Sequence, residues 1–321
     1  MKKIISVALA LALVLSLGVS AFAKTSEQVD RHLHYNDDGK FTIMQIADLQ
    51  DFAIMRLPTK ELLKAELKAN PCDLIVLTGD NISPATLISS TSLTLGSANM
   101  AIWQFMSLFE SYGIPVAITF GNHDDQFTTA TKQAQLKMYE QYKCFVGCAG
   151  ENFGKSNLCT YYIPIYDSAE SNEVKNLVWV VDSGTYKDGN MLGSYAATTP
   201  AQINWYKQTS QKFEAQYGHK IPGLMFQHIV VPEIWNALKM VDSSTPGAVE
   251  YKGNYYVLPD GTKGVLGEVP CPPDYTTGQF AAVAQRGDVM AMFFGHDHTN
   301  SYEIKNFHFT GDIYAIPEGT P

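Results

Sequence analysis

Apolar runs that end in small polar clusters recur along this chain and predict alternating strands and helices. In the first half, an alternating segment at 41–47 and two continuous apolar runs at 73–78 and 115–120 have the length and β-rich composition of strands. Apolar residues at helical spacing lie between them, at 58–70 and 97–112. The order strand, helix, strand, helix, strand indicates a parallel α/β arrangement.

The second half continues the alternation. We expect helices over 130–142, 200–217 and 278–285, and strands over 159–166, 177–182, 224–227 and 289–294. Thr199 and Pro200 give the second helix an N-cap and a proline at its first position. The segment 242–275 is the least regular stretch, rich in Gly and Pro, and is interpreted as an excursion over the functional site.

The first 23 residues are typical of a secretory signal peptide. A basic start at Met1-Lys2-Lys3 precedes an apolar run from Ile4 to Val19 and a small-x-small site at Ala21-Phe22-Ala23. The alternative, a membrane anchor, needs a longer apolar stretch of about 20 residues. We therefore predict cleavage after Ala23, a single catalytic domain over 24–321 with no stable membrane span, and a secreted, periplasmic or cell-envelope location.

Composition limits the partners. The chain is 45% hydrophobic and 17% charged, as in an ordinary globular protein, and carries a formal net charge of −9. No Lys/Arg cluster follows the signal, so nucleic acid is disfavoured as a dominant partner, because duplex binding depends on neutralising phosphates. An acidic surface also suits a chain that binds cations through carboxylates.

The five cysteines match no small disulfide framework. They are Cys72, Cys144, Cys148, Cys159 and Cys271. Metal binding by the three in the middle is disfavoured, because there is no second Cys pair at zinc spacing. Either one local disulfide or a set of buried thiols accounts for them.

The candidate chemistry lies where the predicted strands end. The clusters are Asp48-Leu49-Gln50, Gly79-Asp80-Asn81, Gly121-Asn122-His123-Asp124, Gln227-His228 and Gly295-His296-Asp297-His298. Open parallel sheets bind ligands at the carboxyl ends of their strands, so we expect these side chains to meet. Carboxylates, amides and imidazoles together suit zinc, manganese or iron. The set is too large for one tetrahedral ion, whereas two ions about 3.5–4 Å apart that share one carboxylate would use it fully.

In their order and spacing, these clusters resemble the motif series of the calcineurin-like metallophosphoesterase superfamily, over about 41–300. The last motif, Gly295 to Asn300, reads GHDHxN and resembles bacterial and eukaryotic relatives of purple acid phosphatases. The resemblance implies an α/β fold, a four-layer α/β/β/α sandwich of two mixed sheets flanked by helices. It also implies hydrolysis of a small phosphomonoester by a metal-bridging hydroxide, with phosphodiester or nucleotide cleavage as the alternative.

The resemblance also implies a role for each motif residue. The first divalent metal ion would be held by Asp48, Gln50, Asp80 and His298, and the second by Asp80, Asn122, His228 and His296. His123 would contact the phosphoryl group and assist the leaving oxygen, oriented by Asp124.

The chain departs from the family pattern at Gln50, where the family usually has His. An amide oxygen is a weaker donor to zinc or iron than imidazole, so we expect a weaker first site, or one biased toward manganese, magnesium or calcium. Asp51 is a candidate extra carboxylate. Asn81-Ile82-Ser83 holds no Tyr of the kind that purple acid phosphatases place there, so we expect no purple colour. The other class of function is a degenerate binding protein with one metal or none, against which the His123-Asp124 pair argues.

Three segments are expected to decide the substrate: 125–131, the loop around Tyr186, and 242–275. Tyr186, Asp188 and Asn190 are interpreted as a solvated polar loop rather than as residues that approach substrate. The chain ends at 316–321, soon after the last motif, and a C-terminally shortened product is one interpretation.

Overall fold

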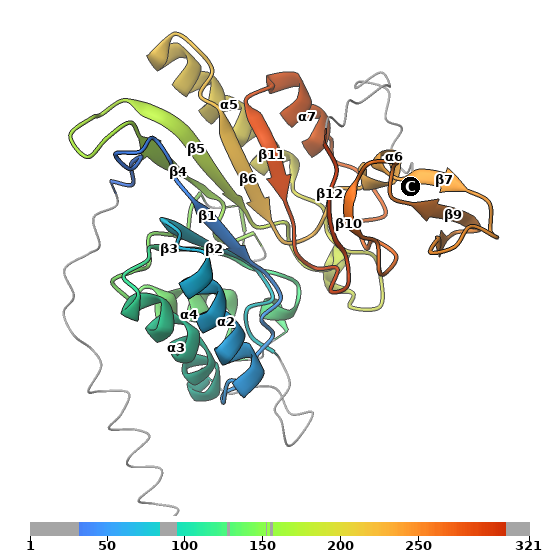
Figure 1. Ribbon diagram of the computed structural model, residues 1–321, viewed down its shortest axis with the longest axis horizontal. Coiled ribbons are helices and arrows are strands. Elements are labelled where there is room, and N and C mark those ends of the chain that lie inside the picture. Colours follow the sequence, from blue (N-terminus) through green and yellow to red (C-terminus); the bar gives the residue numbers. More distant parts are fainter. Residues whose placement is uncertain (1–31, 84–94, 127–128, 152, 155–156, 306–321) are drawn as a thin grey trace, which may run out of the picture.

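The computed structural model describes residues 32–83, 95–126, 129–151, 153–154 and 157–305. In these ranges two β-sheets face each other and helices cover their outer sides (Figure 1). The predicted signal at 1–23 and the end of the chain at 316–321 lie outside the described residues. Within the described ranges, no helix combines the length and the apolar character needed to cross a membrane.

The first sheet is parallel and has the order β1-β2-β3. Its strands are β1 (Ile43–Ile46), β2 (Leu74–Thr78) and β3 (Val116–Thr119). Both β2 and β3 are buried along their whole length, which explains why they read as continuous apolar runs. The helices α2 (Leu57–Ala69), α3 (Leu95–Ser111) and α4 (Lys132–Tyr139) lie on its outer face (Figure 1).

The second sheet is mixed and has the order β11-β6-β5-β4, with β4 antiparallel to the other three strands. Its strands are β4 (Tyr161–Tyr166), β5 (Val174–Val181), β6 (Gly223–Gln227) and β11 (Val289–Phe293). The helices α5 (Pro200–Tyr217) and α7 (Gln279–Arg286) cover it. The predicted cap of α5 is confirmed: Thr199 and Gln202 form a reciprocal capping box.

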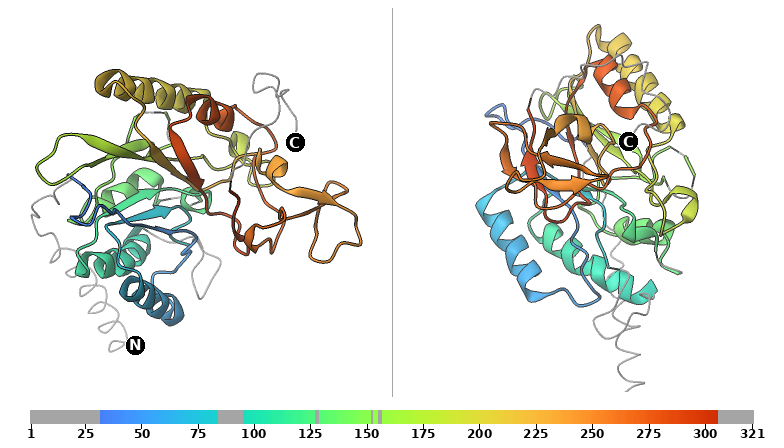
Figure 2. Two further views of the ribbon diagram at one scale, coloured as in Figure 1. Left: turned by 45° about the horizontal axis from the view of Figure 1, so that its top comes forward. Right: turned by 90° about the vertical axis from the view of Figure 1, so that its right-hand side faces the viewer.

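Strand β5 shows how the four layers are held together. Val178 and Val180 join the core between the two sheets, whereas Leu177, Trp179 and Val181 pack with Tyr206 under the outer helices. This alternation follows from the two-residue period of a strand. Figure 2 shows the resulting order of helix, sheet, sheet and helix. The expected α/β/β/α sandwich is confirmed, and among its described strands only the second sheet is mixed.

The segment 242–275 is more regular than the sequence suggested. After the short helix α6 (Ile234–Ala237), the strands β7 (Lys239–Val241), β8 (Val249–Tyr251) and β9 (Asn254–Val257) form an antiparallel sheet that projects from the sandwich (Figure 1). Its own small core contains Trp235, Leu238 and Tyr256. A further pair joins β10 (Lys263–Val265) to β12 (Ser301–Glu303). The prediction of an irregular stretch was wrong for these residues, because the Tyr and Val residues of β8 and β9 favour strands.

All five cysteines fall within the described ranges, and no disulfide joins any two of them. Burial raises the pKa of Cys144 to about 12 and raises that of Cys159 well above its usual range. A thiol that resists deprotonation is a poor metal ligand, since the thiolate is the ligating form. Of the two sequence interpretations, the local disulfide is not formed, and buried thiols describe Cys144 and Cys159 but not the exposed Cys271.

Candidate metal centre

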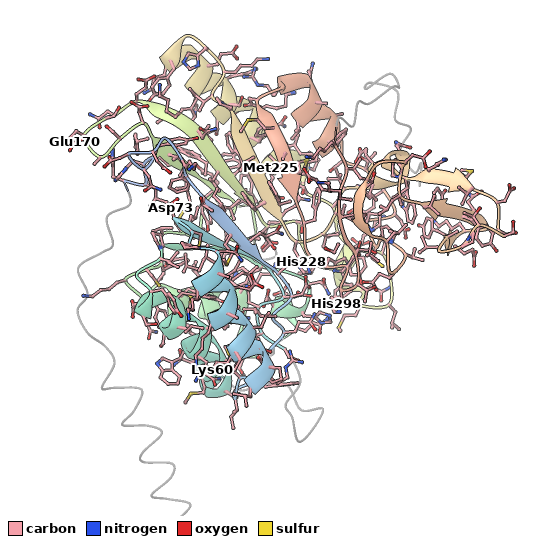
Figure 3. The ribbon with its side chains drawn as sticks, viewed as in Figure 1. Lys60, Asp73, Glu170, Met225, His228 and His298 are labelled. Atoms are coloured by element: carbon pink, nitrogen blue, oxygen red, sulfur yellow. The ribbon has the colours of Figure 1, made fainter. Side chains whose placement is uncertain are left out.

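The polar clusters meet where the carboxyl ends of both sheets converge. Figure 3 shows His228 and His298 at this end, opposite Asp73 at the start of β2. Glycines allow the close approach. A Cβ on Gly121 would lie 2.1 Å from Asp80 Oδ1, and one on Gly295 would lie 2.8 Å from Asp48 Oδ2. The presence of glycine before Asn122 and before His296 therefore has a steric reason.

Four of the expected ligands form a buried half-site: Asp80, Asn122, His228 and His296. One ligand atom each of Asp80, His228 and His296 lies within 4.8 Å of the others. His228 Nδ1 lies 3.0 Å from the carbonyl oxygen of Thr78 and donates its proton there. The other ring nitrogen, Nε2, then faces Asp80 Oδ2 at 3.2 Å.

The electrostatics of this half-site favour a positive charge at its centre. Burial alone would lower the pKa of His228, but Asp80 and Asp48 outweigh it and raise that pKa to about 9. Burial raises the pKa of Asp80, yet His228 and His123 outweigh burial and hold it well below its usual range. Burial, with help from His228, lowers the pKa of His296 to about 3. His296 is therefore a neutral donor beside an ionised carboxylate.

Four buried atoms that could ligate a metal ion have no hydrogen-bond partner among the described residues: Asp48 Oδ1, Asn122 Oδ1, His228 Nε2 and His296 Nε2. His228 Nε2 is close to Asp80, but the pair lacks hydrogen-bond geometry. An unsatisfied buried polar group costs about 1–3 kcal/mol. Asp48 Oδ1, Asn122 Oδ1 and His296 Nε2 offer lone pairs, and His228 Nε2 offers one once it gives up its proton, as metal binding requires. The donor set thus fits a metal ion.

The other half-site is more open to solvent and consists of the half-buried Asp48 and Gln50 and the exposed His298. Gln50 Nε2 lies 3.3 Å from Asp80 Oδ2 and 3.1 Å from His298 Nε2. His298 Nε2 lies 3.6 Å from Asp48 Oδ1, and the His298 side chain is 53% exposed. Rotation of the Gln50 amide by half a turn would direct its oxygen at the same two partners. The structure thus brings all seven expected ligands together, and their metal binding stays a prediction.

His123 lies at the edge of this centre. Its backbone N–H donates to Asp80 Oδ1 at 2.8 Å, and its Nε2 lies 3.9 Å from Asp80 Oδ2. The side chain is 34% exposed, so the imidazole reaches both the buried ligands and the solvent. This position suits contact with a bound phosphoryl group.

Comparison with known proteins decides the family. Residues 41–300 match the family model of the calcineurin-like phosphoesterases. The chain belongs to this family. It is 27% identical over 305 residues to "Probable inactive purple acid phosphatase 14" of Arabidopsis thaliana, covering 85% of this chain and 69% of that one. It is 27% identical over 307 residues to "Probable inactive purple acid phosphatase 29" of the same plant, covering 85% and 70%. With "Phosphatase DCR2" of Saccharomyces cerevisiae it shares 25% identity over 305 residues, 86% of this chain and 47% of the relative.

Asp124 has a different place in this chain from the one expected. Its buried carboxylate accepts the backbone N–H groups of Gly121 at 2.8 Å and Asn81 at 3.1 Å. The imidazole of His123 is held instead by Gln126, whose Oε1 accepts from Nδ1 at 2.9 Å. Burial and the charge of Asp80 raise the pKa of Asp124 to about 7. Asp124 therefore ties two strand-end loops together, and the hydrogen bond from His123 Nδ1 assigns the orientation of the imidazole to Gln126.

Asp51 supplies no extra ligand. Its carboxylate is buried, accepts the backbone N–H groups of Phe52 and Arg56, and pairs with the Arg56 guanidinium at 3.2 Å. The oxygens are engaged in the turn that leads into α2. The expectation of an additional carboxylate was wrong because Asp51 is the residue that organises this turn.

Tyr186 was missed as a site residue. Its hydroxyl accepts from Asn122 Nδ2 at 3.1 Å and from Gln126 Nε2 at 2.9 Å. Its ring stacks on Tyr195, which meets His296 edge-on at 4.4 Å between ring centroids. Asp188 and Asn190 are exposed, as a solvated loop requires. The sequence signal that could have indicated this role is the pair Tyr186 and Tyr195 on either side of a polar, Gly-rich loop.

A cavity of about 1050 Å³ opens beside the open half-site. Asp48, Gln50 and His298 form part of its wall, with Phe52 and Arg56 from the following turn. The cavity gives a small molecule access to Asp48, Gln50 and His298.

Proposed function

We propose that this chain is an exported, metal-dependent phosphoesterase that hydrolyses small phosphomonoesters at a dinuclear site. The observation that carries the proposal is a set of four buried ligand atoms, in the same site as the ionised carboxylate of Asp80, that have no hydrogen-bond partner among the described residues. Family membership supports phosphoester chemistry. Export rests on the sequence of residues 1–23.

Asp48, Gln50, Asp80 and His298 would hold one ion, and Asp80, Asn122, His228 and His296 would hold the other. When bound, such a pair supplies an activated water nucleophile and neutralises charge on the phosphoryl oxygens. The protein orients its own donors in advance. Thr78 fixes the tautomer of His228, and the backbone N–H of His123 fixes the carboxylate of Asp80.

His123 would act as the general acid. With Nδ1 held by Gln126, the ring presents Nε2 to the centre and to solvent. A proton carried at Nε2 can pass to the leaving oxygen as its bond to phosphorus breaks. Such a positioned acid typically contributes about 10²–10⁴-fold to the rate.

A second candidate is a metal-binding protein without catalysis. Two observations favour it: Gln50 is a neutral donor in an exposed half-site, and the two plant relatives carry the words "probable inactive" in their names. The retained and well-ordered His123 argues for the enzyme. A phosphodiesterase that uses the same ligands is the nearest enzymatic alternative.

The deciding experiment combines metal analysis with two substrates. The purified chain, supplied with Mn²⁺, is expected to hydrolyse p-nitrophenyl phosphate faster than bis-p-nitrophenyl phosphate. His123→Ala should reduce turnover by about 10²-fold or more while leaving the metal content unchanged. His219→Ala is the matched control, since His219 is an exposed histidine that contacts its neighbour Lys220.

Three outcomes separate the candidates. Metal binding without turnover under any divalent ion would contradict the enzyme and support the binding protein. A preference for the diester would contradict the monoesterase. For export, N-terminal sequencing of chain recovered outside producing cells should begin at Lys24; a retained Met1 would contradict cleavage.

A further inference from the structure

A continuous hydrogen-bonded chain joins one expected metal ligand to the expected general acid. It runs from the Asn122 amide to the Tyr186 hydroxyl, from there to the Gln126 amide, and from Gln126 to the His123 imidazole. The three bonds measure 3.1, 2.9 and 2.9 Å. Asn122 lies directly before His123 in sequence, whereas Tyr186 comes from the connection between β5 and α5.

The directions of these hydrogen bonds determine how the side-chain amides of Asn122 and Gln126 are oriented. An amide has a donor end and an acceptor end, so a partner at one end determines which atom occupies the other. Because Asn122 Nδ2 donates to Tyr186, Asn122 Oδ1 is left as the buried, unpartnered atom in the site. Because Gln126 Nε2 also donates to Tyr186, Gln126 Oε1 faces His123 and accepts its Nδ1 proton.

Tyr186 sits on a small ordered platform. Residues Tyr186 and Tyr195 form an antiparallel bridge, and Lys187 N donates to Ser194 O at 2.8 Å. Ala196 N donates to Thr185 O at 3.1 Å, which closes the other side of the bridge. The stacked Tyr195 ring, at 5.3 Å between centroids, restrains the Tyr186 ring. The backbone bridge and the ring stacking therefore hold the Tyr186 hydroxyl in place independently of the two amides that donate to it.

We propose that Tyr186 and Gln126 are positioning residues that orient Asn122 for metal binding and His123 for proton transfer from one shared hydroxyl. The proposal has two parts. The first, called the metal arm, is the orientation of Asn122, and it requires only that Asn122 binds an ion. The second, called the His123 arm, is the orientation of His123 for proton transfer, and it rests on the proposed function. Removal of the hydroxyl would free both amides to rotate. Removal of the Gln126 amide would release His123 alone.

The metal arm is tested by titrating the metal-free chain with Mn²⁺ in a calorimeter, without substrate. Tyr186→Phe keeps the stacked ring and removes the shared acceptor, so we expect affinity to fall about 10-fold, within the range for partners of metal ligands. Gln126→Leu should leave Mn²⁺ affinity within twofold of the unmodified chain. Tyr217→Phe is the matched control, because its hydroxyl donates to Asn172 O at the far end of α5.

The His123 arm is tested on the metal-free chain by ¹⁵N NMR of the histidine rings. The Nδ1–H signal of His123, assigned by its loss in His123→Ala, should shift and exchange faster with water in Gln126→Leu and in Tyr186→Phe. Gln126→Glu should restore it, since a carboxylate oxygen can accept from Nδ1 while the other accepts from the Tyr186 hydroxyl. Leucine fills the same volume without an acceptor and provides the contrast.

Unchanged Mn²⁺ affinity in Tyr186→Phe, or an unchanged His123 signal in Gln126→Leu, would overturn the proposal. Neither measurement needs turnover. A chain that binds Mn²⁺ but hydrolyses nothing would contradict the proposed function, and the positioning effects would still be measured. A chain that binds no Mn²⁺ would remove the metal arm together with the proposed function.

Discussion

The two half-sites of the candidate metal centre share Asp80 but differ in how their remaining ligands are held. On the buried side, His228 has no exposed side-chain surface, and both it and Asn122 have a second contact that fixes their orientation. On the open side, the His298 side chain is 53% exposed, and its hydrogen-bonding contact is with the Gln50 amide. The first arrangement is preorganised for a cation, whereas the second must be ordered by one.

The difference has an energetic meaning. Donors that are already desolvated and oriented lose little further entropy on binding, and their unsatisfied lone pairs favour the bound state. Exposed donors on rotatable side chains must lose water and rotamer freedom first. We therefore expect one tightly held and one weakly held ion. We expect Gln50, which stands where the family usually has His, to weaken further the half-site that packing already leaves loose.

Asp80→Asn is expected to have the largest effect, because it removes the carboxylate that both half-sites share. The asparagine keeps the size of the side chain but leaves His228 and His296 without their anionic partner. We expect loss of both ions and a fall in turnover well above the roughly 10–100-fold typical of changes to residues that hydrogen-bond to metal ligands. Metal content by mass spectrometry and phosphatase assays measure the two effects.

Asp73→Asn is the control for that substitution, since Asp73 precedes the same strand at its other end and caps Thr42 N at 2.6 Å. It should retain both ions. Full metal content in Asp80→Asn would contradict the shared role of this carboxylate.

The comparison itself is tested by removing one ligand from each side. Asn122→Ala should weaken the tighter ion by about 100-fold, and His298→Ala should weaken only the looser ion, by about 10-fold, using the range for changes around metal ligands as a guide. Calorimetric titration with Mn²⁺ resolves two binding steps if the sites differ. Equal losses in the two variants would show that burial does not set the affinity.

The sequence predicted most of this fold because its main elements are locally specified. Continuous apolar strands β2 and β3 and the capped helix α5 each carry a pattern that one stretch of chain contains by itself. The expected ligands could be identified from the sequence equally well, since they directly follow those strands. The small sheet of β7, β8 and β9 was missed because its three-to-four-residue strands fall below the length at which alternation is recognisable.

The contacts around the ligands could not be predicted, because they join positions far apart in the chain. Nothing near Asn122 indicates that Tyr186 accepts its amide, a partner 64 residues away. Asp124 was given the task of orienting His123 because it is adjacent in sequence, yet the turn directs its carboxylate to Gly121 and Asn81. Gln126 is close enough to have been considered. Its role becomes visible only when the 3-10 turn at 123–125 places it under the imidazole.

Gln50→His would sharpen the comparison in the opposite direction by strengthening the open side. Gln50 has a φ of 38°, a left-handed conformation that His tolerates better than most side chains, so the backbone should accept the change. An imidazole is a stronger donor to zinc than an amide oxygen, and we expect about 10-fold tighter binding of the looser ion. Gln50→Ala should weaken it. Calorimetry with Zn²⁺ and Mn²⁺ checks both, and identical affinities in the three forms would exclude Gln50 as a ligand.

The smallest expected effect is a pH dependence of stability that belongs to the buried half-site. Burial opposes the charge on His228, but Asp80 and Asp48 raise its pKa to about 9 in the folded metal-free chain, above the ordinary value of about 6.5. A raised pKa contributes stability that is complete below the unfolded pKa and is lost as pH rises through the folded pKa. Between pH 7 and pH 8 the free energy of unfolding should therefore fall by about 1 kcal/mol.

Urea unfolding at the two pH values measures this change. Asp124, with its pKa of about 7, also loses stabilising free energy as the pH rises, but most of that loss occurs below pH 7. His228→Asn should therefore flatten the dependence of the free energy of unfolding on pH between pH 7 and pH 8. His298→Ala, on the exposed side, should leave the slope in place. Saturating Mn²⁺ should abolish it, because metal binding holds the imidazole neutral and releases its proton. A slope that persists with Mn²⁺ would place His228 outside the bound metal site, and the contrast between the two half-sites would then have to be drawn without it.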